Sequence, residues 1–168
     1  MRDDVILITW FHLSNRDVLQ VHPRSDESRP LTGVFATMAV KGGEVVAHAG
    51  AVDHSPLSPA VGYRITCPDG IVAVSGDTRP CAGVTELARG ADVLVHEVML
   101  GSLVTDQAVA DYHSDAAAVG RCAAELEVPV LVLTHLIPAP DTQQVREAYV
   151  AAVRGAGFTG ELHVADDL

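Results

Sequence analysis

The chain has 168 residues, of which 48% are apolar and 20% charged, the size and balance of one globular domain rather than two. Its 22 acidic and 11 basic side chains leave a net charge of -11, which disfavours tight binding to a nucleic-acid backbone unless the arginines gather on one face. Because the glycines and prolines are scattered and charge blocks are short, extended low-complexity tails are excluded.

The first third of the chain, to about residue 52, is expected to be rich in β-structure. Residues 5–9 predict a strand, and residues 23–30 (PRSDESRP) predict a polar loop. Residues 34–40 and 44–52 have the composition of two strands, with Lys41-Gly42-Gly43 as the turn between them. This pattern predicts a β-hairpin.

From residue 62 onward, short β-rich runs alternate with helical patterns. Strands are predicted at residues 62–66, 71–75, 92–96, 130–134 and 161–165. Helices are predicted at residues 83–89, at 114–127 with Ser114 as the N-cap, and from 141 to 155, with Asp141 and Gln144 forming a variant capping box. The order of these elements indicates an α/β or α+β layered domain.

The cysteines and the apolar runs indicate the compartment. Cys67, Cys81 and Cys122 are an odd number with no C-x-x-C pair, which is typical of reduced thiols in a cytoplasmic protein. The apolar run at residues 5–11 follows two aspartates and precedes no small-residue cleavage site. We therefore expect neither a secretion signal nor a membrane span.

Polar residues that bind metals or move protons gather where the predicted strands and helices end. They are Asp53-His54, Ser75 to Thr78 with Asp77, His96-Glu97, Thr134-His135, and His113 before the second long helix. In α/β sheets the ends of neighbouring strands share one rim, so these residues are candidates for one site. Several also have a purely structural explanation: Asp77 as a turn residue, His135 as a strand-end histidine with its hydrogen bonds satisfied, and His96, Glu97 and His113 as surface residues.

A family resemblance rests on five stretches that follow one another in the chain: VDHSPLSPAVGYRIT, SGDTRPC, ELARGADVLVHE, YHSDAAAVG and LVLTHLIP. In this order, with 36 positions from Asp77 to His113 and 22 from His113 to His135, they resemble the second half of a metallo-β-lactamase-fold hydrolase of the ribonuclease Z type. The resemblance implies an α+β fold, the αββα sandwich, and largely its C-terminal half. We expect a single, N-terminally incomplete domain over residues 1–168, recognisable over 44–168 and poorly assigned over 1–43.

The resemblance also implies the roles of the candidate residues. In that family two zinc ions share a bridging carboxylate and a hydroxide that attacks a phosphoester or similar bond. The implied ligands are His54 for one ion, Asp77 as the bridge, and His135 for the other ion. His113 would protonate the leaving group, with Glu97 holding its ring and raising its pKa. Backbone N–H groups at Ser114 would receive a phosphate oxygen.

The main zinc motif of the family, H-x-H-x-D-H, does not occur in these 168 residues. Two protein ligands per ion are too few for tight binding, so we expect the isolated chain to be inactive or nearly so. Three alternatives stay open: an enzyme whose first half is encoded upstream, a non-catalytic remnant or interaction module, and a half-domain completed by another chain.

The substrate expectation depends on charge and on two departures from the transfer-RNA-processing members. Asp115 places a carboxylate where phosphate should approach, and Leu136-Ile137-Pro138 replaces the serine and arginine associated with RNA. Together with the acidic net charge, these residues favour a small-molecule ester or phosphodiester over RNA. No membrane partner is expected, and an exposed sheet face would allow self-association.

Overall fold

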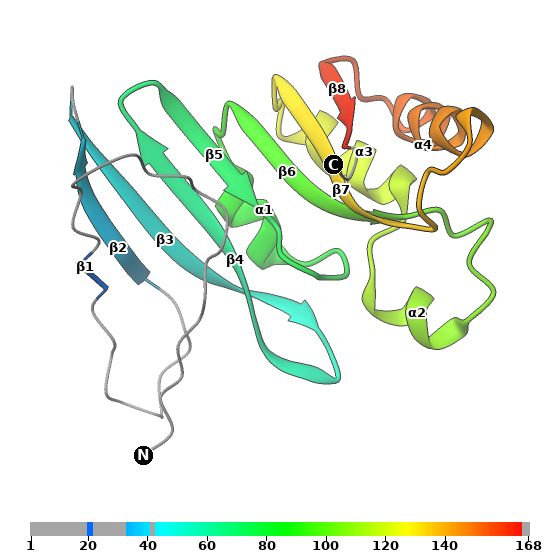
Figure 1. Ribbon diagram of the computed structural model, residues 1–168, viewed down its shortest axis with the longest axis horizontal. Coiled ribbons are helices and arrows are strands. Elements are labelled where there is room, and N and C mark those ends of the chain that lie inside the picture. Colours follow the sequence, from blue (N-terminus) through cyan, green and yellow to red (C-terminus); the bar gives the residue numbers. More distant parts are fainter. Residues whose placement is uncertain (1–19, 22–32, 41–42, 166–168) are drawn as a thin grey trace.

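The computed structural model describes residues 20–21, 33–40 and 43–165. Eight strands in this part of the chain form one sheet in which chain order and spatial order coincide (Figure 1). The strands are β1 (Gln20–Val21), β2 (Gly33–Val40), β3 (Gly43–His54), β4 (Leu57–Cys67), β5 (Gly70–Val74), β6 (Val93–Met99), β7 (Val130–Ile137) and β8 (Glu161–Val164).

The sheet is antiparallel at one end and parallel at the other. Neighbouring strands are antiparallel from β1 to β5 and parallel from β5 to β8. Since β3 and β5 are both antiparallel to β4, β3 runs in the same direction as β5, β6 and β7. The carboxyl ends of these four strands therefore lie at one edge of the sheet.

The predicted hairpin of residues 34–40 and 44–52 is confirmed. Strands β2 and β3 pair in an antiparallel register that ends with Val40 opposite Gly43. The strand predicted at residues 5–9 and the loop predicted at 23–30 lie outside the described residues. The five strands predicted from residue 62 onward are all present, although β4, β6 and β7 are longer than expected.

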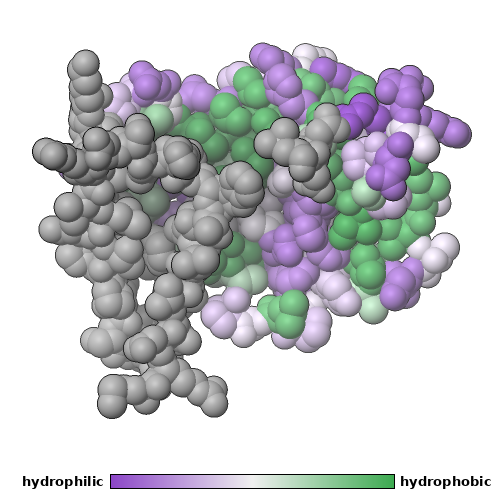
Figure 2. Space-filling model, viewed as in Figure 1, coloured by the Kyte–Doolittle hydropathy of each residue, from purple (hydrophilic) through white to green (hydrophobic). Residues whose placement is uncertain are grey.

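The helices α1 (Ala82–Ala88), α3 (Ala116–Glu125) and α4 (Gln143–Gly155) share one hydrophobic core with one face of the sheet. Alternate strand residues supply the sheet side of this core, namely Ala73, Leu94, Leu131 and Leu133, as expected for strands with a repeat of two. The valines between them are only half-buried. Figure 2 shows hydrophobic residues at the surface on the side from which Figure 1 is viewed. One helix layer on a mixed sheet confirms the α+β class.

A short fourth helix and two helix starts differ from the sequence-based expectation. Helix α2 (Gln107–Tyr112), with an N-cap contact from Asp106, was not predicted because its six residues carry no apolar period. The N-cap of α3 is Asp115 rather than Ser114, and that of α4 is Thr142 rather than Asp141. In both cases the actual cap accepts a hydrogen bond from a backbone N–H of the first turn. Among the described residues, no helix is long and apolar enough to cross a membrane.

Candidate functional site

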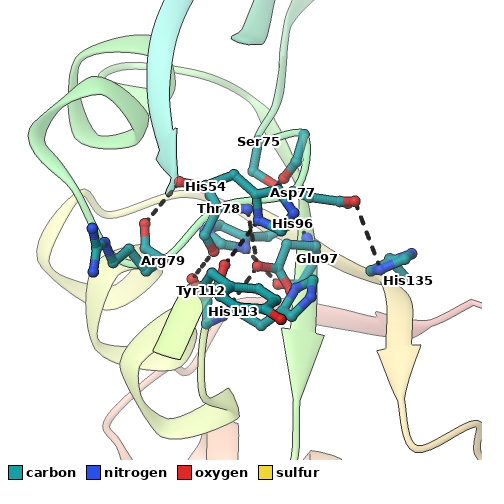
Figure 3. Close-up of polar contacts among 12 residues, drawn as sticks. His54, Ser75, Asp77, Thr78, Arg79, His96, Glu97, Tyr112, His113 and His135 are labelled. Atoms are coloured by element: carbon teal, nitrogen blue, oxygen red, sulfur yellow. Dashed lines mark hydrogen bonds and ion pairs between the residues drawn. The ribbon is translucent and has the colours of Figure 1, made fainter. Parts of the chain in front are cut away.

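Five of the candidate residues lie together at the edge of the sheet where β3, β5, β6 and β7 end (Figure 3). They are His54, Asp77, Glu97, His113 and His135. His113 is central: its ring centroid lies 5.0 Å from that of His54 and 5.5 Å from that of His135. Asp77 Oδ2 lies 3.8 Å from His135 Nε2, and Glu97 Oε2 lies 3.3 Å from His113 Nδ1. The tertiary structure thus brings residues from five separate segments into one cluster.

His135 lies at an irregular position inside β7, not at the strand end that the sequence predicts. Along β6 and β7, Glu97 pairs with Thr134 and Val98 pairs with Leu136, so His135 is the extra residue of a β-bulge. Its φ of 44° is in the left-handed region, which costs a non-glycine residue free energy. Such bulges re-aim a side chain next to a site, and the His135 side chain remains 49% exposed.

His54 ends β3, and its ring is oriented by the backbone of α2. Its Nδ1 lies 3.0 Å from the carbonyl oxygen of Tyr112, and its ring stands edge-on to the Tyr112 ring. A carbonyl can only accept a hydrogen bond, so His54 Nδ1 carries the proton and donates it there. The Nε2 lone pair is then free to bind a metal, the arrangement common for metal-binding histidines.

Glu97 is a buried carboxyl group that joins two loops of the site. It is 1% exposed, and its Oε1 accepts hydrogen bonds from the backbone N–H of Thr78 at 3.1 Å and of Ser114 at 3.0 Å. Burial raises the pKa of Glu97 to about 8. Among the described residues, Glu97 Oε2 and His113 Nδ1 have no well-aligned hydrogen-bond partner, and they face each other.

The expectation that Glu97 raises the pKa of His113 is wrong. Burial lowers the pKa of His113, and the neighbouring His54 and His135 lower it further. With the pKa of Glu97 raised, both members of the pair are neutral near pH 7. In a pair of neutral groups, Glu97 Oε2 carries the proton that lies toward His113 Nδ1, which leaves the ring proton of His113 on Nε2. A neutral pair of this kind can pass a proton outward through the ring.

The expected phosphate site at the start of α3 is also wrong. The backbone N–H of Ser114 already donates to Glu97, so it cannot receive a phosphate oxygen. The carboxylate of Asp115 accepts hydrogen bonds from the N–H groups of Gly101 and Ala117, at 3.0 Å and 2.9 Å. The Asp115 carboxylate therefore caps α3 and binds the backbone of the segment that follows β6.

His96, the neighbour of Glu97, is not part of the cluster. It is 2% exposed, and its Nδ1 lies 2.6 Å from the carbonyl oxygen of Glu97, to which it donates. Burial lowers the pKa of His96 to about 4, so its neutral form is the one present in the folded protein near pH 7. Successive strand residues point to opposite faces, which separates His96 from the site.

Two further residues belong to the site but were not singled out from the sequence as a pair. Arg79 and Asp53 form a forked ion pair, with Nε to Oδ2 at 2.7 Å and an Nη to Oδ1 at 3.1 Å. The Arg79 guanidinium holds the pKa of the Asp53 carboxyl well below its usual range. Each lies within two positions of a candidate ligand, His54 or Asp77, but only the fold brings the two segments together.

The donor chemistry at this edge suits a metal ion, whereas the number of donors does not. Imidazole nitrogen and carboxylate oxygen are ordinary zinc ligands, and two ligands of one tetrahedral zinc lie about 3.3 Å apart, close to the Asp77–His135 separation. Among residues 44–165, however, no group of three or more His, Cys, Asp or Glu side chains is arranged to hold a metal ion. The described residues by themselves do not complete a metal site.

A cavity of about 590 Å³ opens beside His135. It is formed by the end of β7, the loop that leads to α4 and the residue after β8, with the lining Thr134, His135, Leu136, Ala139, Pro140, Asp141 and Ala165. The cavity therefore offers room next to the cluster for part of a substrate.

Comparison with known proteins identifies relatives over most of the chain. The chain is 38% identical over 122 residues to the ribonuclease Z of Mycobacterium avium, an alignment that covers 69% of this chain and 43% of that protein. It is 34% identical over 131 residues to the ribonuclease Z of Mycolicibacterium gilvum, covering 74% of this chain and 45% of that protein. The chain thus spans about half the length of the curated relatives it matches. No family model matches the sequence.

Among solved structures, YhfI from Bacillus subtilis is a similar protein, a metallo-beta-lactamase fold protein with a TM-score of 0.58 and 22% identity. The match covers 73% of this chain and 47% of YhfI. Igni18, a metallo hydrolase from Ignicoccus hospitalis, has a TM-score of 0.51 at 17% identity, over 73% of this chain and 50% of that protein.

The expectation of a small-molecule substrate in preference to RNA is wrong. The relatives at 34–38% identity are ribonucleases, enzymes whose substrate is RNA. The net charge of -11 misled because it sums the whole chain. At the site itself, His135 lies beside Asp77, and the Asp115 carboxylate accepts hydrogen bonds from the backbone N–H groups of Gly101 and Ala117.

Proposed function

Because the chain has the metallo-β-lactamase fold and is homologous to ribonuclease Z over its C-terminal part, we propose that it contributes to metal-dependent hydrolysis of phosphodiester bonds in RNA. The observation that carries this proposal is the convergence of His54, Asp77, His113 and His135 at one sheet edge. The metal we propose is a pair of zinc ions, with His54 and His135 as ligands of one ion each and Asp77 as the shared ligand. Bound zinc would supply an activated water as the nucleophile.

The proton chemistry is assigned to the buried pair. His113 donates its Nε2 proton to the oxygen that leaves phosphorus, and Glu97 passes its Oε2 proton to His113 Nδ1. The imidazole stays neutral throughout, so its low pKa is no obstacle to this role. Glu97 ends as a carboxylate held by the N–H groups of Thr78 and Ser114, and the proton that the next water loses on becoming the nucleophile would return to Glu97 through the ring of His113.

An RNA cleavage assay tests this function. The purified chain should cleave an end-labelled RNA hairpin with a single-stranded 3′ extension when zinc is added, and a chelator should stop the reaction. His135→Ala should lose the cleavage, because it removes a ligand of the proposed metal. The matched control is His163→Ala, which removes another exposed histidine, on the neighbouring strand β8, and should keep it. Equal activity of the two variants would contradict the assignment.

We propose further that the chain by itself holds zinc weakly and cleaves RNA slowly. Two observations support this. Among the described residues, too few potential metal ligands lie together to complete a site, and the 168 residues contain no H-x-H-x-D-H motif. Elemental analysis after dialysis against metal-free buffer should find fewer than two zinc ions per chain. Two tightly held zinc ions per chain would contradict this expectation.

The same donor count supports a second candidate function, a non-catalytic binding module. Such a module would retain labelled RNA without cleaving it, at any zinc concentration. A half-domain completed by another chain would instead gain zinc and activity when that chain is added. Zinc content and RNA cleavage measured on the same sample therefore distinguish the three possibilities.

We also propose a cytoplasmic location. Cys67, Cys81 and Cys122 are free thiols in the structure, the state that a reducing compartment maintains. Because no cysteine pair in the described residues is bridged, the fold of that part does not depend on an oxidising compartment.

A further inference from the structure

Thr78, the residue after Asp77, is fully buried, with 0% exposure. It makes hydrogen bonds through its backbone N–H, its backbone carbonyl and its hydroxyl group, and each of these reaches a different segment. Figure 3 shows it between the candidate residues. A single buried residue that connects several segments of a site through its backbone and its side chain is in a place to set their relative positions.

The hydroxyl of Thr78 connects the Asp77 turn to the end of β3. Its Oγ1 accepts a hydrogen bond from the backbone N–H of Asp53 at 3.1 Å, and its own proton is donated to the carbonyl of Arg79 at 2.8 Å. The N–H of Arg79 returns to the carbonyl of Asp53 at 2.8 Å. Asp53 immediately precedes His54, so this contact holds the backbone that carries His54.

The backbone of Thr78 connects the same turn to the proton-transfer pair. Its N–H donates to Glu97 Oε1 at 3.1 Å, and its carbonyl accepts from the hydroxyl of Ser114 at 2.8 Å. Ser114 is 1% exposed and immediately follows His113. Of the contacts made by Thr78, only those of the hydroxyl depend on the identity of its side chain.

We propose that Thr78 is a positioning residue that holds His54 in register with Asp77 and His113. Valine has nearly the same shape as threonine but cannot accept a hydrogen bond from the backbone N–H of Asp53. That N–H group is partly buried and would be left without its partner. Serine keeps the hydroxyl. That this position of His54 matters for catalysis rests on the proposed function. The position of His54 relative to Asp77 and His113 is a property of the folded chain, so it can be measured without any substrate.

Amide hydrogen exchange followed by NMR tests the proposal. In Thr78→Val the protection of the Asp53 amide should fall about tenfold relative to that of a core amide such as Leu131, the loss expected when one hydrogen bond of about 1.4 kcal/mol is removed. Thr78→Ser should restore the protection. The matched control is Thr85→Val in α1, which removes a hydroxyl that contacts the carbonyl of Cys81 and should leave Asp53 protected.

A second readout reports on the site itself. The ring Cε1–H signal of His54 should shift in Thr78→Val and return to its wild-type position in Thr78→Ser. Unchanged Asp53 exchange and an unchanged His54 signal in the valine variant would overturn the proposal. If Thr78→Val does not fold, the exchange rate of the Asp53 amide in the wild type tests the proposal instead. The proposal expects this amide to exchange about 100-fold more slowly than in a free peptide, and exchange at the free-peptide rate would overturn it. Neither result depends on RNA cleavage.

Discussion

Replacing Glu97 by alanine is expected to lower the free energy of unfolding by about 4 kcal/mol. The substitution leaves the buried N–H groups of Thr78 and Ser114 without an acceptor, at about 1 to 3 kcal/mol each, and it opens a cavity in a fully packed place. Urea unfolding followed by circular dichroism measures the change. The free energies of unfolding of wild type and variant should be compared at pH 7, where the chain is expected to unfold in a single cooperative transition.

Glu97→Gln is the matched variant, and it should cost less than about 1 kcal/mol at pH 7. Its amide oxygen can accept the same two N–H groups, and its NH₂ group can donate to His113 Nδ1 as the protonated carboxyl does. Because burial raises the pKa of Glu97 to about 8, the wild-type group is already mostly neutral at pH 7. Equal losses in the alanine and glutamine variants would show that the two N–H contacts do not stabilise the fold.

Glutamine should also change the response to alkali. The raised pKa of Glu97 stabilises the fold fully below about pH 4.5, and this contribution is lost as the pH rises through about 8. The glutamine variant has no proton to lose at this position, so its stability should decline less than that of the wild type between pH 6 and pH 9.

Acid should destabilise the protein through His96. The pKa of His96 is lowered from 6.5 to about 4 by burial, so its neutral form stabilises the fold above pH 6.5, and this contribution is lost as the pH falls towards 4. The lowering amounts to about 3 kcal/mol, since one pKa unit corresponds to about 1.4 kcal/mol. The free energy of unfolding should therefore fall steeply between pH 6.5 and pH 4.

His96→Asn isolates this contribution. The asparagine amide can donate to the carbonyl of Glu97 in place of Nδ1 but does not titrate in this range. The difference in stability between wild type and variant should shrink by about 3 kcal/mol from pH 7 to pH 4. His163→Asn, at an exposed histidine, should follow the wild type. Parallel stability curves for wild type and His96→Asn would refute this account.

Strands and longer helices were predictable because their signals are local. Runs of β-branched residues between turn residues predict β5, β6 and β7, and a glycine after residue 89 correctly places the end of α1. Helix α2 lacks such a signal, and the N-cap of α3 was assigned one residue early because serine and aspartate are equally good caps. The fold settles that choice, since the hydroxyl of Ser114 is already donated to Thr78.

The candidate site was predictable as a set of residues but not as an arrangement. The bulge at His135 depends on how β7 pairs with β6, which no local pattern in β7 encodes. The link from Thr78 to Asp53 spans 25 positions, and the link from Thr78 to Ser114 spans 36. Neither could be inferred from one sequence, because each contact depends on where distant strands end.

What the sequence alone determined is the set of chemical groups and their order: His54, Asp77, Glu97, His113 and His135 at the ends of strands and helices. The tertiary structure decided which of these groups are buried away from water and which groups each one contacts. Burial, a property of the whole fold, makes Glu97 a neutral acid and lowers the pKa of His113, the reverse of the expected effect. A sequence names the donors, whereas desolvation and hydrogen-bond partners arise only when distant segments pack together.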